Sequence, residues 1–489
     1  MRVTDRRRAG ILLHPTSLPE SPGNGDLGHC AWRWVEFLAA SGMSLWQVLP
    51  LVPTADGSPY NGLSTHAGNR WLISLSWLRD RGLLEGFRSE PGETEPKAWR
   101  DAALRHAGRR FRSAPPASLR EPYGRFLQHH AYWLDDFALY SAIREAQEGR
   151  PWWAWPVPLR DRDPQALEKV RQTLDEALEQ ARFEQFVFFT QWAEIRAYAH
   201  RHGVLLFGDL PIYMAPDSAE VWAHRDYFWV DASGRPTRVA GVPPDYFSRQ
   251  GQLWGNPLYR WDRLQADGFG WWTDRMRTQL ELFDIIRIDH FRGLRACWEV
   301  PAGAQTAEQG RWVEVPGEAL LERLNAELGP LPLVAEDLGT ITPDVVELRR
   351  RFGIPGMKVL QFAFDGNPHN AYLPHNMERA CVAYTGTHDN DTSVGWYARL
   401  DDTTRRQLHT YLGWPGEPAP WPLIRAVMAS PADYAIIPAQ DMLGLDSTAR
   451  MNRPGVPGGN WRWRLPEHWR PEGMEARLLE LVTLYARRT

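Results

Sequence analysis

Cysteine is scarce in this chain of 489 residues. Its three cysteines, Cys30, Cys297 and Cys381, lie far apart in the sequence and form no Cys-x-x-Cys pair. An odd number of distant cysteines supports neither a disulfide framework nor a structural zinc site. We therefore expect a reducing, cytoplasmic setting.

Long hydrophobic runs and an excess of one charge are also absent. No stretch approaches the ~18 consecutive apolar residues of a membrane helix. The apolar run after Arg6, Arg7 and Arg8 is too short for a signal peptide. The 56 basic and 60 acidic residues give a net charge of -4 with no long run of one sign. The sequence therefore predicts no nucleic acid and no membrane as partner, and favours an uncharged ligand.

Tryptophan, in contrast, is abundant, with 25 residues. A core does not need so many side chains that are this large and this hard to bury completely. We expect most of them to pack structurally and some to line a ligand groove, because aromatic faces stack on the C–H faces of sugar rings. The excess points towards carbohydrate.

The stretch DIIRIDHFRG, residues 284–293, is the most informative part of the chain. Its apolar residues predict a buried strand that ends in charged groups, with Arg287 two residues before Asp289. An unpaired ion inside a buried strand would cost several kcal/mol, so these charges should lie at an open strand end. Arg287 keeps Asp289 ionised, which suits a nucleophile. A structural ion pair at a strand end is the alternative.

Several other predicted strands also end in polar groups. We expect eight apolar strands, near residues 14, 48, 208, 287, 335, 361, 384 and 437, with helical segments between most of them. This alternation predicts an α/β fold, a (β/α)8 TIM barrel, in which the loops after the strands form the active site. A doubly wound sheet would need a phosphate-binding glycine motif after its first strand, and residues 10–18 contain none.

We expect a single catalytic barrel over residues 1–489, with two insertions in the loops after the strands. Residues from about 73 to 182 have a mostly helical pattern and predict an inserted subdomain. Residues from about 214 to 268 predict a lid-like loop region over the active site, because long loops in compact domains are usually functional. This region carries Tyr246, Phe247 and Trp254.

The barrel would bring four strand-end carboxylates together with Arg287 and His388. The four carboxylates are those of Asp209, Asp289, Glu336 and Asp389. Crowded carboxylates separate in pKa, so one stays anionic while a less supported one keeps its proton. Cleavage of a glycosidic bond needs this division. Asp289 would be the nucleophile and Glu336 the acid and base. Asp389 would bind sugar hydroxyls and distort the ring.

A metal-dependent lyase or isomerase is the main alternative, because barrels with several strand-end carboxylates often hold a divalent cation. Arg287, beside the central Asp289, would repel such a cation. The sequence also has no paired His-x-x-Glu ligand spacing. We therefore favour glycosyl chemistry and predict no metal site.

Eight motifs, in order along the chain, resemble those of the 4-α-glucanotransferases, also called amylomaltases or disproportionating enzymes, which form glycoside hydrolase family 77 of the α-amylase superfamily. The motifs are WQVLPL (46–51), SPY (58–60), GDLPIY (208–213), RIDHFRG (287–293), VAEDLG (334–339), MKVLQFAFD (357–365), YTGTHDND (384–391) and RMNRPGVPGGNWRWR (450–464). The resemblance implies a cofactor-free, retaining enzyme that moves α-1,4-glucan segments to the 4-hydroxyl of another glucan, with maltooligosaccharides, amylose, glycogen or starch as partners.

By motif position, the resemblance assigns Asp289, Glu336 and Asp389 the roles given above. It also implies that Asp209, Arg287 and His388 surround the sugar at the cleavage point, and that Ser58, Tyr60, Trp254 and Asn452 lie along the groove. The chain departs from the family where STHAGNR replaces the usual SAFAGNP, which introduces Thr65, His66 and Arg70, and where PLVPT replaces PLGPT. We expect these departures to touch the groove or its surroundings and to affect the preferred glucan length.

Transfer and hydrolysis share the covalent glycosyl-enzyme and differ in whether a sugar hydroxyl or water resolves it. The aromatic loop at 241–257 could exclude water and hold an acceptor, which favours a transferase. A hydrolase and a catalytically silent glucan-binding protein remain the alternatives. The sequence gives no expectation for the oligomeric state.

Overall fold

Eight parallel strands form the centre of the protein. The computed structural model describes residues 6–19, 21–88, 95–244, 249–414, 416–456 and 458–488. In the sheet order β10-β11-β12-β1-β2-β3-β6-β9, the strands are β10 Gly356–Val359, β11 Cys381–Tyr384, β12 Tyr434–Pro438, β1 Arg8–Leu12, β2 Leu45–Gln47, β3 Leu205–Pro211, β6 Ile285–Asp289 and β9 Leu333–Ala335. The amide of Ala335 donates to the carbonyl of Pro355, just before β10, over 2.8 Å and brings the two ends of the sheet together. The predicted (β/α)8 barrel is confirmed, and each expected strand lies within a few residues of its predicted position.

The inner face of the barrel is apolar at its base and charged at the carboxyl end of β6. Ile285 belongs to an apolar cluster inside the barrel that includes Phe207 and Val334, whereas Ile286 and Ile288 join the larger cluster between strands and helices. Side chains alternate between the two faces of a strand. Arg287 and Asp289 therefore lie on the same inner face as Ile285, at the open end of the strand.

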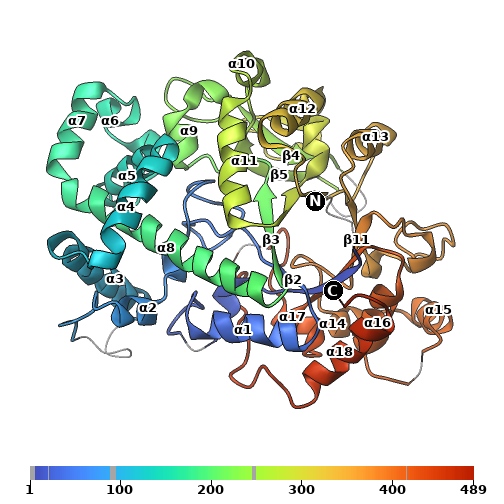
Figure 1. Ribbon diagram of the computed structural model, residues 1–489. Coiled ribbons are helices and arrows are strands. Elements are labelled where there is room, and N and C mark those ends of the chain that lie inside the picture. Colours follow the sequence, from blue (N-terminus) through green and yellow to red (C-terminus); the bar gives the residue numbers. More distant parts are fainter. Residues whose placement is uncertain are drawn as a thin grey trace.

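Helices surround the strands, as Figure 1 shows. They include α1 His29–Ala40, α11 Gly270–Leu282, α12 Gly317–Leu328, α13 Pro343–Arg351, α16 Trp421–Ala429 and α18 Met474–Leu484. Three short or outer helices follow the later strands, namely α14 Ser393–Ala398, α15 Asp402–Leu412 and α17 Ala439–Met442. In the part of the chain that the structure describes, no helix combines the length and apolarity needed to span a membrane.

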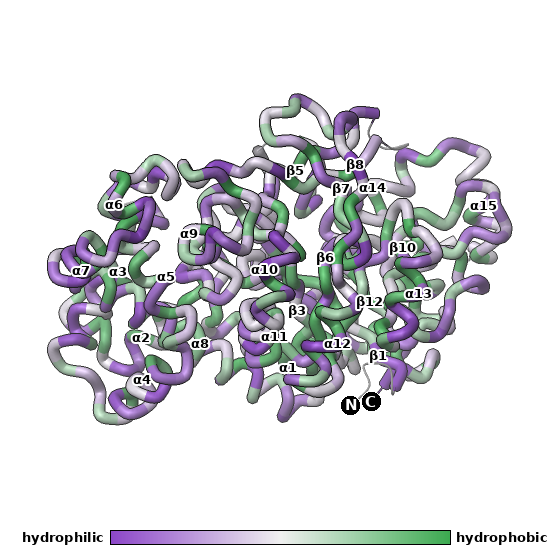
Figure 2. The backbone as a smooth tube through the Cα atoms, turned by 90° about the horizontal axis from the view of Figure 1, so that it is seen from above, coloured by the Kyte–Doolittle hydropathy of each residue, from purple (hydrophilic) through white to green (hydrophobic). Residues whose placement is uncertain are grey.

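The connection between β2 and β3 is a group of helices at one side of the barrel (Figures 1 and 2). They are α2 Leu75–Asp80, α3 Pro96–Ser113, α4 Ala117–His129, α5 Ala131–Ala146, α6 Val157–Arg160 and α7 Pro164–Thr173. Helix α8, Asp175–Arg201, runs from this group to β3 without interruption. The boundary predicted near residue 182 for the inserted subdomain therefore falls inside one continuous helix.

The connection between β3 and β6 contains more regular structure than the predicted loop. It includes α9 Ala219–Ala223, β4 Arg238–Val242, β5 Gln252–Pro257 and α10 Trp261–Ala266. Strand β4 pairs antiparallel with β5 and with β7 Ala296–Pro301, and β7 pairs with β8 Arg311–Glu314. Figure 2 shows β5, β7 and β8 at the side of the molecule opposite the two termini. Tyr246 and Phe247, which we expected in a lid, lie outside the described residues.

A glycine in β3 allows close packing beside the first acidic strand end. A Cβ atom on Gly208 would lie 2.2 Å from the ring of Phe283, which precedes β6. No larger residue fits there unless the ring moves. The backbone that carries Asp209 can therefore pack directly against the start of β6.

Candidate active site

Three charged side chains on β3 and β6 form a continuous ion chain. Asp209 lies opposite Arg287 in the strand register, and Pro211 lies opposite Asp289. Arg287 donates Nη1 to both carboxylate oxygens of Asp209 over 2.7 Å, and its Nη2 lies 2.7 Å from Oδ1 of Asp289. The Asp209 side chain is fully buried, whereas the Asp289 side chain is 30% exposed. Arg287 therefore joins a buried carboxylate to one that is open to a ligand.

Glu336 follows β9 and is held beside Asp289 by backbone amides. Its own amide donates to the carbonyl of Ile288 over 3.0 Å. Its Oε2 accepts from the amide of His290 over 2.9 Å, and its Oε1 accepts from the amide of Leu338 over 3.1 Å. His290 has a φ of 53°, which is uncommon for a residue other than glycine. Such conformations cluster at functional sites, where the surrounding structure holds them.

Asp289 and Glu336 have different surroundings. Burial raises the pKa of Glu336 to about 8; the charge of Arg287 opposes this shift and the charge of Asp289 adds to it. Among the described residues, no cationic side chain lies within ion-pair distance of Glu336, whereas Arg287 contacts Asp289 directly. Glu336 therefore keeps its proton near neutral pH, and Asp289 beside it is paired with the guanidinium of Arg287. The ion pair of Arg287 with Asp289 and the raised pKa of Glu336 agree with the sequence-based expectation, and the division of catalytic roles stays a prediction.

Asp389 lies after β11 and is held by the segment that follows β12. Asn452 donates Nδ2 to Oδ1 of Asp389 over 2.6 Å, and Nε2 of His388 lies 3.4 Å from Oδ2. Arg450 donates Nη2 to the Asp389 carbonyl over 2.9 Å. The Asp389 side chain is 44% exposed, so it remains accessible to a ligand. The structure therefore brings Asp389 together with His388 and Asn452, two residues that were predicted separately to bind the sugar.

An aromatic cluster stands beside these carboxylates. The Tyr60 hydroxyl donates to Oδ2 of Asp209 over 2.6 Å, and its ring stacks on His388 with centroids 5.2 Å apart. Trp461 completes the cluster at 5.8 Å from Tyr60 and 6.0 Å from His388, with a φ of 64°. Our reading of the sequence missed Trp461 and Arg450 as single residues, although both belong to the motif at 450–464. Their contacts depend on the path of that loop, which the motif alone does not give.

The two remaining predicted binding residues lie in different surroundings. The ring of Trp254, on β5, is 37% exposed and meets the ring of His290 edge-on, with centroids 4.8 Å apart and an interplanar angle of 84°. Trp254 is therefore close to the residue that follows Asp289. Ser58 lies in the loop after β2, where its amide donates to Asp56 over 2.9 Å. No contact described for Ser58 joins it to the three acids, and its role stays a prediction.

Asp209 and Arg287 have a supporting place in this geometry. Their side chains are 0% and 5% exposed, and the polar partners of Asp209 are Arg287 and Tyr60. Asp209 holds the side chains of Arg287 and Tyr60, and Arg287 holds the carboxylate of Asp289. A direct contact of Asp209 with the sugar stays a prediction.

The residues that depart from the family pattern contact helices rather than the acids. Thr65 accepts from Nε of Arg275 over 2.8 Å, and Nδ1 of His66 is 2.8 Å from the hydroxyl of Thr278; both partners lie on α11. Arg70 forms ion pairs with side chains of α3 and α8. We expected these departures to touch the groove or its surroundings. The structure places Thr65, His66 and Arg70 in the packing of the loop against its neighbouring helices, and the side chains of Thr65 and His66 are buried.

One group of side chains resembles a set of metal ligands, away from the acids. Nε2 of His129 and of His130 lie 3.8 and 3.4 Å from the two carboxylate oxygens of Glu281. However, Nδ1 of His130 accepts from the indole of Trp133 over 3.1 Å. In the neutral ring the proton is then on Nε2, which can donate to Glu281 but has no lone pair for a metal. These residues do not fit a metal site.

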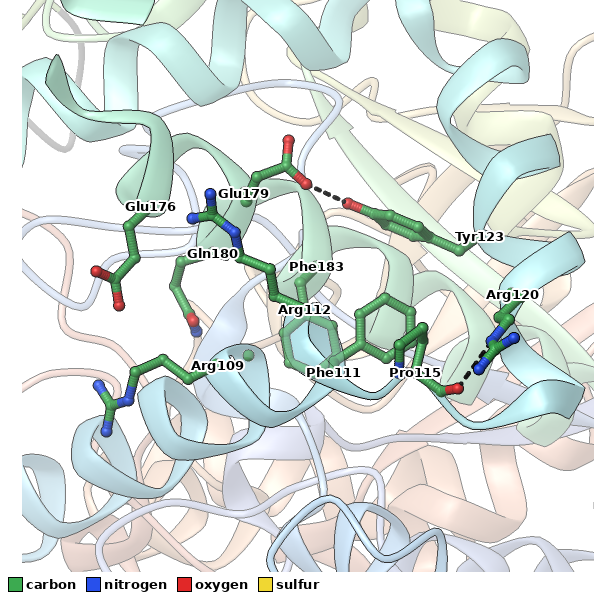
Figure 3. A pocket seen from close by; sticks show the side chains of 11 residues that line it. Arg109, Phe111, Arg112, Pro115, Arg120, Tyr123, Glu176, Glu179, Gln180 and Phe183 are labelled. Carbon is green, nitrogen blue, oxygen red and sulfur yellow. Dashed lines mark hydrogen bonds between the residues drawn. The ribbon is translucent and has the colours of Figure 1, made fainter. Parts of the chain in front are cut away.

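A separate cavity of about 300 Å³ lies among α3, α4 and α8 (Figure 3). Its floor includes Phe111 and Phe183, and Tyr123 donates to Glu179 over 3.1 Å at its edge. None of the three predicted catalytic acids lines it. This cavity is therefore separate from the acids at the carboxyl end of the barrel.

A (β/α)8 barrel with a pair of neighbouring carboxyl groups at the carboxyl end of its strands is typical of carbohydrate-active enzymes. The family model described as 4-alpha-glucanotransferase matches residues 13–469. The chain belongs to this family, glycoside hydrolase family 77, and the predicted enzyme class is confirmed.

Individual relatives agree over nearly the full length. The 4-alpha-glucanotransferase of Thermus thermophilus is 48% identical over 484 residues, which cover 94% of this chain and 96% of that protein. The 4-alpha-glucanotransferase of Synechocystis sp. is 45% identical over 500 residues, 99% of each chain. The solved structure of amylomaltase from Streptococcus agalactiae in complex with acarbose has a TM-score of 0.94 at 35% identity and covers 99% of this chain and 100% of that chain.

Proposed function

We propose that the protein transfers α-1,4-glucan segments to the 4-hydroxyl of an acceptor glucan or glucose by a retaining double displacement, with Asp289, Glu336 and Asp389 as its catalytic acids. The observation that carries this proposal is the contrast between Asp289, which contacts Arg287 at 2.7 Å, and Glu336, which is held by two backbone amides and has its pKa raised by burial to about 8. The acarbose bound by the related amylomaltase supports a carbohydrate substrate.

In the first step, an oxygen of Asp289 attacks the anomeric carbon while the glycosidic C1–O bond breaks. Glu336 gives its proton to the departing oxygen, so the leaving glucan departs with an intact 4-hydroxyl. The products are a glycosyl ester on Asp289 and an ionised Glu336. Asp389 hydrogen-bonds the hydroxyls of the sugar ring and stabilises its distorted, cationic transition state.

In the second step, the ionised Glu336 takes the proton from the 4-hydroxyl of the acceptor. The acceptor oxygen attacks C1, the ester bond breaks, and the Asp289 carboxylate is restored. Glu336 regains the proton that it had at the start. The donor and acceptor exchange a glucan segment with net retention at C1.

The substrate surface is proposed to include Tyr60, His388 and Asn452 around the cleavage point and Trp254 on the acceptor side. The partly exposed ring of Trp254, next to His290, supports a stacking position for an acceptor sugar. The segment at 241–257 would act as a lid that shields the glycosyl ester from water. A cytoplasmic location remains part of the proposal and is supported by Cys30, Cys297 and Cys381 being buried free thiols.

The test is the product distribution from pure maltotriose. A transferase yields glucose together with oligosaccharides longer than maltotriose, because each glycosyl ester is passed to another sugar. D289N and E336Q, purified in parallel, should give neither product. Formation only of products shorter than maltotriose, or full activity in D289N, would contradict the proposal.

A further inference from the structure

Arg275, on α11, is a fully buried arginine that contacts no carboxylate among the described residues. Its residue is 1% exposed. In the described ranges, no carboxylate lies within ion-pair distance of it, although Asp and Glu usually pair with buried arginine. A guanidinium has five donors in a rigid fork and stays charged, so burying it without a carboxylate is costly. Such a group needs acceptors that compensate for the lost water.

The acceptors of Arg275 belong to the end of β3, to the loop after β2 and to the segment after β5. Nη2 donates to the carbonyl of Pro211, and Nη1 donates to the carbonyl of Ile212 over 2.9 Å. Nε donates to the Thr65 hydroxyl over 2.8 Å. Tyr259 adds a second donor on the Ile212 carbonyl over 2.7 Å and accepts from Nη1 over 3.0 Å. One side chain therefore ties three segments together.

These segments carry the support of the catalytic acids. Pro211 lies opposite Asp289 in the strand register, and Asp209 precedes Pro211 by two residues on the same strand. The loop that contains Thr65 also carries Tyr60, which donates to Asp209 over 2.6 Å. A shift of the Pro211–Ile212 carbonyls would move Asp209, and with it the Arg287 that contacts Asp289.

We infer that Arg275 is a positioning residue for the proposed transfer reaction. It fixes the end of β3 and so keeps the ion chain of Asp209, Arg287 and Asp289 in its observed arrangement. It touches no substrate and acts through the backbone of Pro211 and Ile212. This inference rests on the proposed function, because it takes Asp289 as the nucleophile. A displacement of a reacting group by about 1 Å can cost about 10²-fold in rate.

Arg487 offers a matched control at the opposite end of the barrel. Its residue is 0% exposed, and it also donates to backbone carbonyls, among them those of Met428 over 2.8 Å, Ser430 over 3.0 Å and Arg8 over 3.1 Å. Arg8 begins β1, so these contacts lie at the amino end of the strands, away from the acids. Arg487 tests what the loss of a buried, carbonyl-bound arginine does to the fold alone.

The experiment compares R275M, R275K and R487M for kcat and KM on maltotriose, with each rate corrected for the folded fraction measured by circular dichroism. We expect R275M to lose about 30- to 100-fold in kcat with KM changed by less than about 3-fold. R275K keeps the charge and some of the donors, so its kcat should lie between those of R275M and the unchanged protein. R487M should unfold more easily but keep its kcat.

Equal kcat values for R275M and R487M, or a change in KM alone, would overturn the inference. If R275M does not fold, the test rests on R275K, whose kcat must still fall by about 5-fold or more, because an ammonium cannot bridge all four acceptors. A wild-type kcat in R275K would also overturn it. Activity in D289N or E336Q would instead contradict the proposed function, so the two failures can be told apart.

Discussion

The backbone amide of His290 donates to Oε2 of Glu336 over 2.9 Å. Because His290 directly follows Asp289, this bond links the strand end that carries the proposed nucleophile to the proposed acid. The main chain links the same two segments, because the amide of Glu336 donates to the carbonyl of Ile288 over 3.0 Å and the amide of Phe291 donates to the carbonyl of Glu336 over 3.1 Å. These two bonds survive a change of either acidic side chain. Substitutions at Asp289 and Glu336 can therefore test chemistry with little change in the position of the two strands.

The first prediction concerns the proton on Glu336. E336Q keeps the side-chain shape but cannot donate or accept the transferred proton, so kcat on maltotriose should fall by about 10²–10⁴-fold. Glucan binding, measured by calorimetry, should change little. The matched control is E184Q, since Glu184 is also a buried glutamate whose pKa is raised by burial, on α8. Full activity in E336Q would refute the assignment of Glu336 as acid and base.

The pH dependence provides a second prediction. The pKa of Glu336 is about 8, and the first step needs its protonated form. The rate should therefore persist through neutral pH and fall about tenfold per unit once the pH exceeds about 8. The measurement is kcat/KM against pH, which reports the free enzyme. A basic limb near pH 5 would contradict this, because it would mean that Glu336 titrates close to its ordinary pKa of 4.5.

A glycosyl substrate with a fluoride leaving group tests whether the basic limb of the pH profile reports the proton on Glu336. Fluoride leaves with little need for protonation, so the basic limb of the first step should weaken or disappear with maltosyl fluoride. An unchanged limb would assign the titration to another group.

These expectations were accessible from the sequence because the desolvation cost of a charge is large. Arg287 and Asp289 interrupt an apolar run, and only an open strand end accommodates them. The alternation of Ile285, Arg287 and Asp289 on one face then follows from the strand itself. The barrel strands and the acid at the end of each could be predicted in this way, because each acid lies next to its own strand in the chain.

Other parts of the site depend on contacts that a linear pattern does not contain. Thr65 and His66 could be read as groove residues, yet their partners Arg275 and Thr278 lie on a helix more than 200 residues later. Trp461 reaches Tyr60 and His388 through a left-handed backbone conformation that no residue preference favours for tryptophan. Loop paths and helix packing decide these contacts.

The ion chain gives a third prediction, on stability. R287M would leave the fully buried Asp209 without its cation and should lower the free energy of unfolding by about 3–5 kcal/mol. The double variant R287M/D209N should recover part of this loss, because the unpaired buried charge is gone. Both variants should be inactive, because in each of them Asp289 has lost its ion pair with Arg287. Chemical denaturation and kcat, measured on the same preparations, provide both readouts.

The control for this prediction is a helical ion pair on the surface. Arg323 and Glu327 on α12 are 2.6 Å apart, and their side chains are 50% and 41% exposed. Pairs of this kind contribute at most about 0.5 kcal/mol. R323M should therefore leave stability almost unchanged. If R287M lost no more stability than R323M, the buried ion chain would not have the role given to it here.

The last prediction concerns the choice between transfer and hydrolysis at Trp254. This ring is 37% exposed and meets His290 edge-on at 4.8 Å, so an acceptor sugar stacked on it would lie close to the glycosyl ester on Asp289. W254A should weaken acceptor binding by about 2- to 10-fold, which corresponds to about 0.5–1.5 kcal/mol for an aromatic contact. Water would then resolve more of the ester. The ratio of longer oligosaccharides to reducing ends formed from maltotriose should fall in W254A, while consumption of the donor stays closer to normal.

Trp312 on β8 is 38% exposed and stacks under Arg292 at 3.9 Å, so W312A is the matched control and should leave the ratio unchanged. An equal ratio in W254A and W312A would remove Trp254 from the acceptor side, and a parallel loss of all products would place it with the donor instead.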